Sequence, residues 1–226
     1  MSEYVQLIKT TFQNNSNSDD AFHMKKYMKN KFEFYGIKSP LRKEISKPFL
    51  KKETLPDVNE ISEIIKILWN EPQRELQYFA MELLFKYSKL LKADDYFLFE
   101  FMITTKSWWD TVDFIASNNV GTHFNMHPKL KNTVLEKWIC SDNMWLNRTA
   151  ILFQLKYKQH TDEELLFSYV LKHIDSTEFF HRKAIGWSLR EYSKTNPKAI
   201  SEFVNKHQNR LSGLSKREAL KVINKI

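Results

Sequence analysis

Apolar side chains recur at intervals of three and four residues along almost the whole chain, which is the spacing of one face of an α-helix. Residues 3–14 form the first such amphipathic segment. A polar break follows at Asn14–Ser18, and Asp19 or Asp20 is placed to cap a second helix that ends near Gly36. With only four glycines in the sequence, the pattern predicts an all-α protein.

Prolines mark the starts of later helices, because proline is tolerated in the first helical turn. They precede predicted helices at Leu41–Leu50 and Glu75–Leu91. Between the helices there is no shift of composition long enough to be an interdomain linker. We therefore expect one domain, residues 1–226.

From Glu75 onward the chain repeats one helical segment. The aligned copies are ELQYFAME, WWDTVDFI, WLNRTAIL and FFHRKAIG, starting at Glu75, Trp108, Trp145 and Phe179. Their sixth positions are Ala80, Asp113, Ala150 and Ala184, at successive spacings of 33, 37 and 34 residues. This period is typical of helical hairpins that stack into a solenoid. The repeat predicts a superhelical solenoid of HEAT-like helical-hairpin repeats.

One copy of the repeat departs from the others, because Asp113 replaces a small alanine. Trp109 lies four residues earlier, and Ser107 is placed to cap a helix that carries both side chains on one face. A carboxylate beside a large aromatic surface suits the binding of a positively charged group. The alternative is that Asp113 is a solvated helix charge, as most aspartates are.

A second stripe combines cations with an aromatic ring. Lys183, Trp187 and Arg190 fall at i, i+4 and i+7 of one predicted helix, and Arg148 and Lys156 belong to the preceding repeat. If these helices line the inner side of the solenoid, their cations form a concave basic face that follows a phosphate backbone. The alternatives are a solvated basic surface and simple burial of Trp187.

The overall charge agrees with a polyanionic partner. Lys and Arg total 35 against 27 Asp and Glu, a formal net charge of +8, which favours nucleic acid first and an anionic membrane surface second. No stretch approaches the roughly 20 apolar residues that span a bilayer, and the opening residues lack a signal-peptide pattern, so we expect a cytoplasmic protein.

Other chemistry has little support in the sequence. Cys140 is the single cysteine, which excludes an intramolecular disulfide and any cysteine-based metal cluster. His123 and His127 lie four apart, but Pro128 should start a new helix and break their shared face, so we expect no metal site. No glycine-rich phosphate loop is present, and we expect no cofactor. Trp138 and Trp145 are expected in the core.

Long motifs resemble one known family. They are KSWWDTVD at residues 106–113, SDNMWLNRTAILFQLKYKQ at 141–159 and KAIGWSLREYSKTNP at 183–197, with KYMKNKFEFYGI and LSKREAL near the two ends. Across essentially its whole length the chain resembles the bacterial DNA alkylation-repair glycosylases of the AlkD type. The resemblance implies a HEAT-like superhelix that removes cationic N3- and N7-alkylated purines from duplex DNA without a metal or organic cofactor.

The resemblance also implies roles for individual residues. By matching motifs, Asp113 resembles the catalytic carboxylate, and Trp109 and Trp187 resemble the aromatic walls beside the lesion. Tyr27, in the matching YMKN segment, is expected beside the lesion, and Arg148 resembles a contact to the DNA backbone. From the basic stripe we add Lys156, Lys183 and Arg190 as expected contacts to DNA or the lesion.

Two other functions compete with glycosylase activity. One is a non-catalytic HEAT-like scaffold that binds nucleic acid, and the other is a protein-interaction scaffold of the same fold. The net positive charge and the pairing of Trp109 with Asp113 argue against the protein scaffold. We expect a monomer, as is common for capped solenoids.

Overall fold

The computed structural model describes residues 3–223, and most of them lie in helices. Within that range there is no strand, although an isolated β-bridge joins Glu33 to Gln73. The all-α prediction is confirmed. Contacts divide the chain into two compact units, Met1–Leu91 and Lys92–Ile226.

The first unit is a small helical bundle. Its helices are α1 (Glu3–Asn14), α2 (Ser18–Tyr27), α3 (Ser39–Ser46), α4 (Ile61–Asn70) and α5 (Arg74–Lys86), with short 3-10 turns at Lys47–Leu50, Lys52–Thr54 and Val58–Glu60. The apolar faces of α1, α4 and α5 meet in its core, where Phe12, Leu68 and Phe79 are fully buried. The rings of Phe12 and Phe79 pack edge to face with their centroids 5.9 Å apart.

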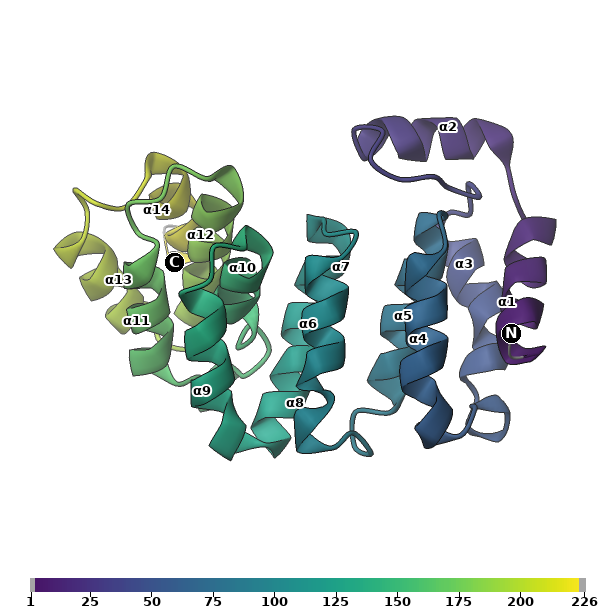
Figure 1. The fold of residues 1–226 in the computed structure, drawn as a ribbon. Helices are drawn as coiled ribbons and strands as arrows, with labels where there is room; N and C mark the ends of the chain where they lie inside the picture. The colour runs from purple at the N-terminus through teal and green to yellow at the C-terminus, as the bar shows by residue number, and fades with distance from the viewer. Residues whose placement is uncertain (1–2, 224–226) are drawn as a thin grey trace. The chain divides into compact units, whose positions relative to one another are not determined.

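Helix α2 has no buried residue and lies across one end of the other helices of its unit (Figure 1). The loop that follows it is anchored to α5. The buried Glu75 carboxylate of α5 accepts backbone N–H bonds from Tyr35, Gly36 and Ile37 at 3.1, 2.9 and 3.1 Å. Gly36 has φ +86°, and a Cβ there would lie 2.0 Å from the Asn17 carbonyl oxygen, so glycine is required.

The ends of α2 differ from those that the sequence predicts. Its cap is Asn17, whose side chain accepts the backbone N–H of Asp20 at 3.0 Å, rather than Asp19 or Asp20. The helix ends at Tyr27 and not near Gly36, because the chain turns through two residues of positive φ shortly afterwards.

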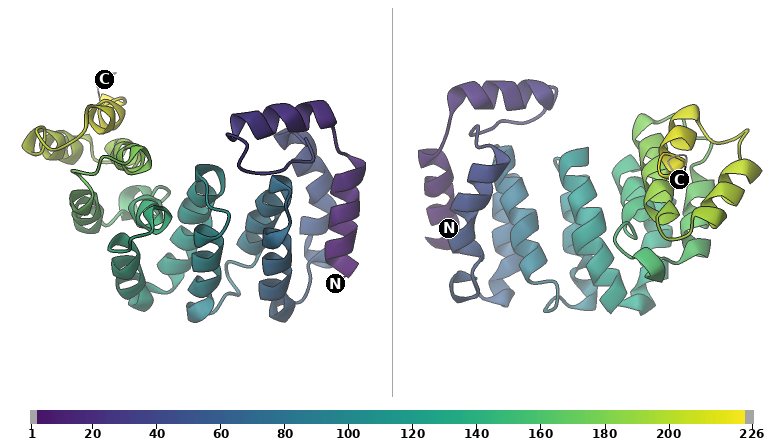
Figure 2. Two further views of the ribbon diagram at one scale, coloured as in Figure 1. Left: turned by 45° about the horizontal axis from the view of Figure 1, so that its top comes forward. Right: turned by 180° about the vertical axis from the view of Figure 1, so that it is seen from behind.

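The second unit contains the rest of the helices. They are α6 (Tyr96–Thr104), α7 (Trp109–Phe114), α8 (Gly121–Met126), α9 (Pro128–Ile139), α10 (Met144–Leu152), α11 (Glu163–Lys172), α12 (Phe179–Ser193), α13 (Pro197–Lys206) and α14 (Gly213–Ala219), with 3-10 turns at Ala93–Asp95 and Lys158–His160 and a π-helix at Ile115–Val120. Helix α10 packs against α9 and α12, and α12 packs in turn against α13 and α14. Two further views show these helices following one another in chain order (Figure 2).

The repeated segments occupy equivalent places on helices. They fall on α5, α7, α10 and α12, in the order in which the sequence aligns them. Ala80, Ala150 and Ala184 are almost fully buried, which agrees with the need for a small residue at a close helix contact. Asp113, at the same repeat position, keeps 15% of its side chain exposed. The repeat therefore sets Asp113 apart from its counterparts in the structure as well as in the sequence.

Some predicted details of the second unit are wrong. His123 and His127 do lie together, with ring centroids 4.7 Å apart, even though Pro128 starts α9 as expected. Trp145 is only half-buried, whereas Trp138 is fully buried and donates its indole N–H to Glu100 at 2.8 Å. Among residues 3–223 no group of three or more His, Cys, Asp or Glu side chains is arranged to hold a metal ion. In the same range no helix is long and apolar enough to cross a membrane.

Candidate active site

The segment before α7 fixes the direction of Trp109 and Asp113. Ser107 does not cap this helix, because its hydroxyl donates to the carbonyl of Ile103 at 2.6 Å and so completes the end of α6. The N-cap is Trp108, whose backbone is extended and has no capping side-chain bond. Helix α7 then starts at Trp109 and brings Asp113 round to the same face one turn later.

Trp109 and Asp113 line one pocket of about 340 Å³ in the second unit. The other lining residues come from α10, α12 and α14; they are Arg148, Phe179, Phe180, Lys183, Trp187, Arg190 and Glu218. Six residues that the sequence selects separately, on three helices, therefore surround the same space. The stripe of Lys183, Trp187 and Arg190 faces this pocket, and Trp187 is only partly buried.

Arg148 binds both oxygens of the Asp113 carboxylate. Its Nε donates to Oδ1 at 2.7 Å and its Nη2 donates to Oδ2 at 2.9 Å, while Nη1 donates to the Phe180 carbonyl at 2.6 Å. The Arg148 side chain is 4% exposed. Such a fork fixes the carboxylate in the plane of the guanidinium and leaves each oxygen one further acceptor position.

The ionisation of Asp113 reflects two opposing effects. Burial raises the pKa of the Asp113 carboxyl above its ordinary value, and the hydrogen bonds and charge of Arg148 act in the other direction. The guanidinium therefore limits the rise of the pKa and favours the ionised carboxyl. The pocket thus contains a carboxylate held in place beside two indole rings.

A π-helix follows α7 directly and carries two polar side chains back toward it. The Ser117 hydroxyl donates to the carbonyl of Asp113 and the Asn118 amide donates to the carbonyl of Phe114, both at 2.9 Å. These bonds satisfy carbonyl groups at the point where the helix widens, and such π-helical insertions are frequent at functional sites. Lys156 extends to the Asn118 side-chain oxygen. Lys156 is exposed and does not line the pocket.

Glu218 is the site residue that the repeat pattern does not reveal. Its carboxylate, from α14, accepts hydrogen bonds from Lys183 and Arg190 and is 15% exposed. Two aromatic residues that the sequence does not select as site residues also line the pocket. Phe179 is exposed at its rim, and the ring centroid of Phe180 lies 5.2 Å from that of Trp108 and 4.9 Å from that of Trp145. The motif LSKREAL contains Glu218 and is the one sequence signal that could have indicated it.

Tyr27 belongs to the first unit. It is the last residue of α2 and is 72% exposed, so its ring is accessible to a ligand of that unit. Its predicted contact with DNA stays a prediction. The predicted contact of Arg148 with the DNA backbone does so too, since the described contacts of its guanidinium are to Asp113 and Phe180.

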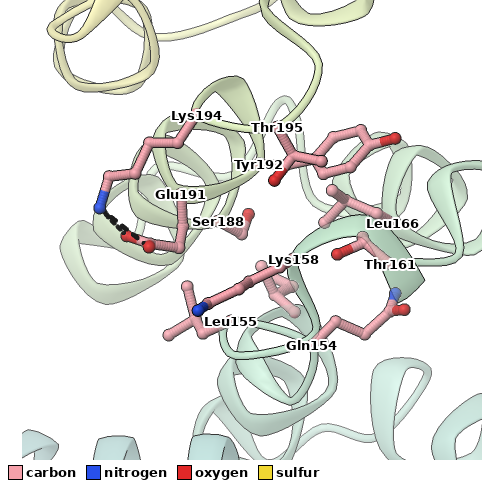
Figure 3. A pocket seen from close by; sticks show the side chains of 11 residues that line it. Gln154, Leu155, Lys158, Thr161, Leu166, Ser188, Glu191, Tyr192, Lys194 and Thr195 are labelled. Carbon is pink, nitrogen blue, oxygen red and sulfur yellow. Dashed lines mark hydrogen bonds and ion pairs between the residues drawn. The ribbon is translucent and has the colours of Figure 1, made fainter.

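A separate pocket of about 180 Å³ lies between the end of α10 and the helices α11 and α12 (Figure 3). Glu191 and Lys194 form an ion pair at its edge, at 2.7 Å. The buried Gln154 side chain accepts the backbone N–H of Asp162 at 2.7 Å and donates to the carbonyl of the same residue at 3.2 Å. The Gln154 amide is thus bonded to the backbone, and none of the site residues predicted from the sequence lines this pocket.

Comparison with known proteins identifies the family and the fold of the chain. The family model of the DNA alkylation repair enzymes matches residues 8–223, nearly the whole chain. The chain belongs to this family, which places it in the repair of alkylated DNA and implies DNA as its partner.

A solved structure described as a predicted DNA alkylation repair enzyme from Enterococcus faecalis is similar to this chain throughout. The two share 32% sequence identity and a TM-score of 0.86, over 93% of this chain and 98% of the other. The fold is therefore that of the DNA alkylation repair proteins. A search of curated proteins finds no match.

Proposed function

We propose that this protein is a DNA glycosylase of base-excision repair that hydrolyses the N-glycosidic bond of positively charged N3- or N7-alkylated purines in duplex DNA. The observation that carries the proposal is the Asp113 carboxylate, fixed by Arg148 in a pocket that Trp109 and Trp187 also line. Substrates of the 3-methyladenine and 7-methylguanine type fit this arrangement because they carry a positive charge.

The chemistry of such a substrate requires little acid catalysis. Alkylation at N3 or N7 makes the purine a cationic leaving group, and its departure leaves an oxocarbenium-like sugar. A preorganised anion stabilises that developing charge, as a carboxylate does in glycoside hydrolysis. Asp113 has one acceptor position left on each oxygen, so it can face the sugar cation or accept a hydrogen bond from the attacking water.

The two tryptophans supply binding energy for the same charge. An indole face attracts a cation by about 0.5–2 kcal/mol, and Trp109 and Trp187 come from different helices, α7 and α12. A neutral purine gains less from either ring and leaves more slowly. Selectivity for alkylated bases then follows from charge, and no metal or organic cofactor enters the reaction.

The test is excision of 7-methylguanine from methylated duplex DNA, followed by alkaline cleavage of abasic sites and electrophoresis. We expect Asp113→Asn to slow single-turnover excision by at least about a hundredfold, the effect of removing a preorganised charge-stabilising group. DNA binding should change little. Asp175→Asn is the matched control, since Asp175 also pairs with an arginine in the second unit but is exposed.

The outcomes separate the competing functions. Excision by wild type that the Asp113 variant retains would remove this carboxylate from the mechanism. Salt-dependent DNA binding without abasic product would favour a non-catalytic nucleic-acid scaffold. Neither binding nor excision would favour a protein-interaction scaffold.

A further inference from the structure

Glu218 enters the same pocket as Asp113 from a different helix. Its carboxylate lies against two cations of α12, with Oε2 3.4 Å from Lys183 Nζ and Oε1 in contact with Arg190 Nη1. Trp187 stands between these two cations on the stripe that lines the pocket. The Glu218 carboxylate can therefore neutralise the two cations that flank Trp187.

The approach of α14 to α12 is built into the backbone. Gly186 lies between Lys183 and Arg190 on α12, and a Cβ there would be 2.6 Å from the Cβ of Glu218. About one helical turn before Glu218 on α14, the Ser215 hydroxyl donates to the Arg182 carbonyl at 2.9 Å. The absence of a side chain at Gly186 and this hydrogen bond between α14 and α12 therefore fix the position of Glu218 against α12.

The charge of the pocket depends on this acid. Arg148, Lys183 and Arg190 contribute three positive charges, and Asp113 and Glu218 contribute two negative charges, which leaves one net positive charge. Without Glu218 the net charge would be two positive, which is unfavourable for a cationic base and for a sugar that becomes positive. Unpaired Lys183 and Arg190 could also stack on Trp187 and occupy the indole face.

We propose that Glu218 determines specificity for cationic lesions: it neutralises Lys183 and Arg190, so that a positively charged nucleotide can approach Trp187 and Asp113. This inference rests on the proposed glycosylase function. Glu218 makes no contact with the reacting atoms in this proposal. It sets how strongly the pocket prefers a charged ligand over a neutral one.

Two abasic-site analogues in the same duplex test the preference. A pyrrolidine analogue is cationic, and a tetrahydrofuran analogue is neutral and of similar shape. We expect wild type to bind the pyrrolidine duplex more tightly, and Glu218→Gln to reduce the ratio of the two affinities by about tenfold, the consequence of one additional positive charge in a partly buried site. Affinity for undamaged DNA should hold or increase. Glu202→Gln, which changes the net charge equally on an exposed part of α13, should leave the ratio at its wild-type value.

A second variant keeps the test independent of folding. In Glu218→Gln with Arg190→Gln the pocket returns to one net positive charge, and we expect the wild-type preference to return. A purely structural role for Glu218 predicts instead that both affinities fall together and that the double variant is no better. An unchanged ratio in Glu218→Gln, or no recovery in the double variant, would overturn the inference. Failure of the proposed function would look different, since wild type itself would then show neither excision nor a preference for the cationic analogue.

Discussion

Replacing Arg148 by glutamine tests whether this residue keeps Asp113 ionised. The substitution removes the positive charge and the two hydrogen bonds of 2.7 and 2.9 Å that Asp113 accepts. Since burial raises the pKa of Asp113 and Arg148 opposes that shift, the pKa should rise further in the variant. Each hydrogen bond to a charged group contributes about 1.5–3 kcal/mol, so the loss of both bonds removes a large part of the stabilisation of the anion.

The sign of the effect on activity follows from the form of Asp113 that the reaction needs. The proposed mechanism requires the anion, so excision should be lost as pH falls through the pKa of Asp113, and a higher pKa should move this acid limb to higher pH. Single-turnover excision of 7-methylguanine, corrected for spontaneous depurination, should be measured from pH 5 to 9. Arg148→Gln should be most impaired at the acid end and recover partly at the alkaline end.

A surface pair of the same chemistry serves as the control. Arg210 holds Asp175 by two hydrogen bonds, but both side chains are largely exposed, and such pairs contribute about 0–1 kcal/mol. Arg210→Gln should therefore leave the pH profile and the stability nearly unchanged. Arg148→Gln should cost about 3–5 kcal/mol of folding free energy, as expected when one partner of a buried ion pair is removed. A wild-type pH profile in a folded Arg148→Gln protein would refute the role assigned to this ion pair.

Three further predictions concern stability. Gly186→Ala should cost about 1–3 kcal/mol in thermal unfolding, because the new methyl group meets Glu218, whereas Gly213→Ala finds only an ordinary 3.5 Å contact and should be tolerated. Burial lowers the pKa of His181 to about 4 from 6.5, so the unfolded chain binds the proton more readily between these values. Stability should then fall by about 2 kcal/mol as pH drops from 6.5 to 4 in urea titrations, and His181→Asn should flatten this dependence. Glu75→Gln should weaken the three backbone bonds behind α2 and speed hydrogen exchange of residues 28–37, with no change in that of α12.

The sequence predicts the architecture well because the fold depends on repetitive local patterns. Helical spacing gives the all-α class, and the aligned alanines mark helix contacts that are buried in the structure. The same alignment isolates Asp113, and the four-residue spacing from Trp109 places both in one pocket. Helix ends are less predictable: the N-caps are Asn17 and Trp108, whereas the sequence predicts Asp19 or Asp20 and Ser107.

Contacts between distant helices lie beyond such patterns. The pairing of Arg148 with Asp113 joins residues 35 positions apart, and that of Arg190 with Glu218 spans 28. Neither follows from a local period, because it depends on how neighbouring helices are packed. The sequence therefore identifies the cations and Asp113 as separate candidates, and the structure shows which acid pairs with each of Arg148, Lys183 and Arg190.

The guanidinium of Arg148 connects three helices, since it extends from α10 to a side chain on α7 and to a main-chain carbonyl on α12. If these helices moved apart, a charge that is almost completely shielded from water would lose its counter-ion, which is unfavourable by several kcal/mol. These helices should therefore move little relative to one another, and we expect a ligand that enters the pocket to adjust its own shape. For the duplex substrate proposed above, the ease with which the strand bends at a damaged nucleotide would then become part of recognition.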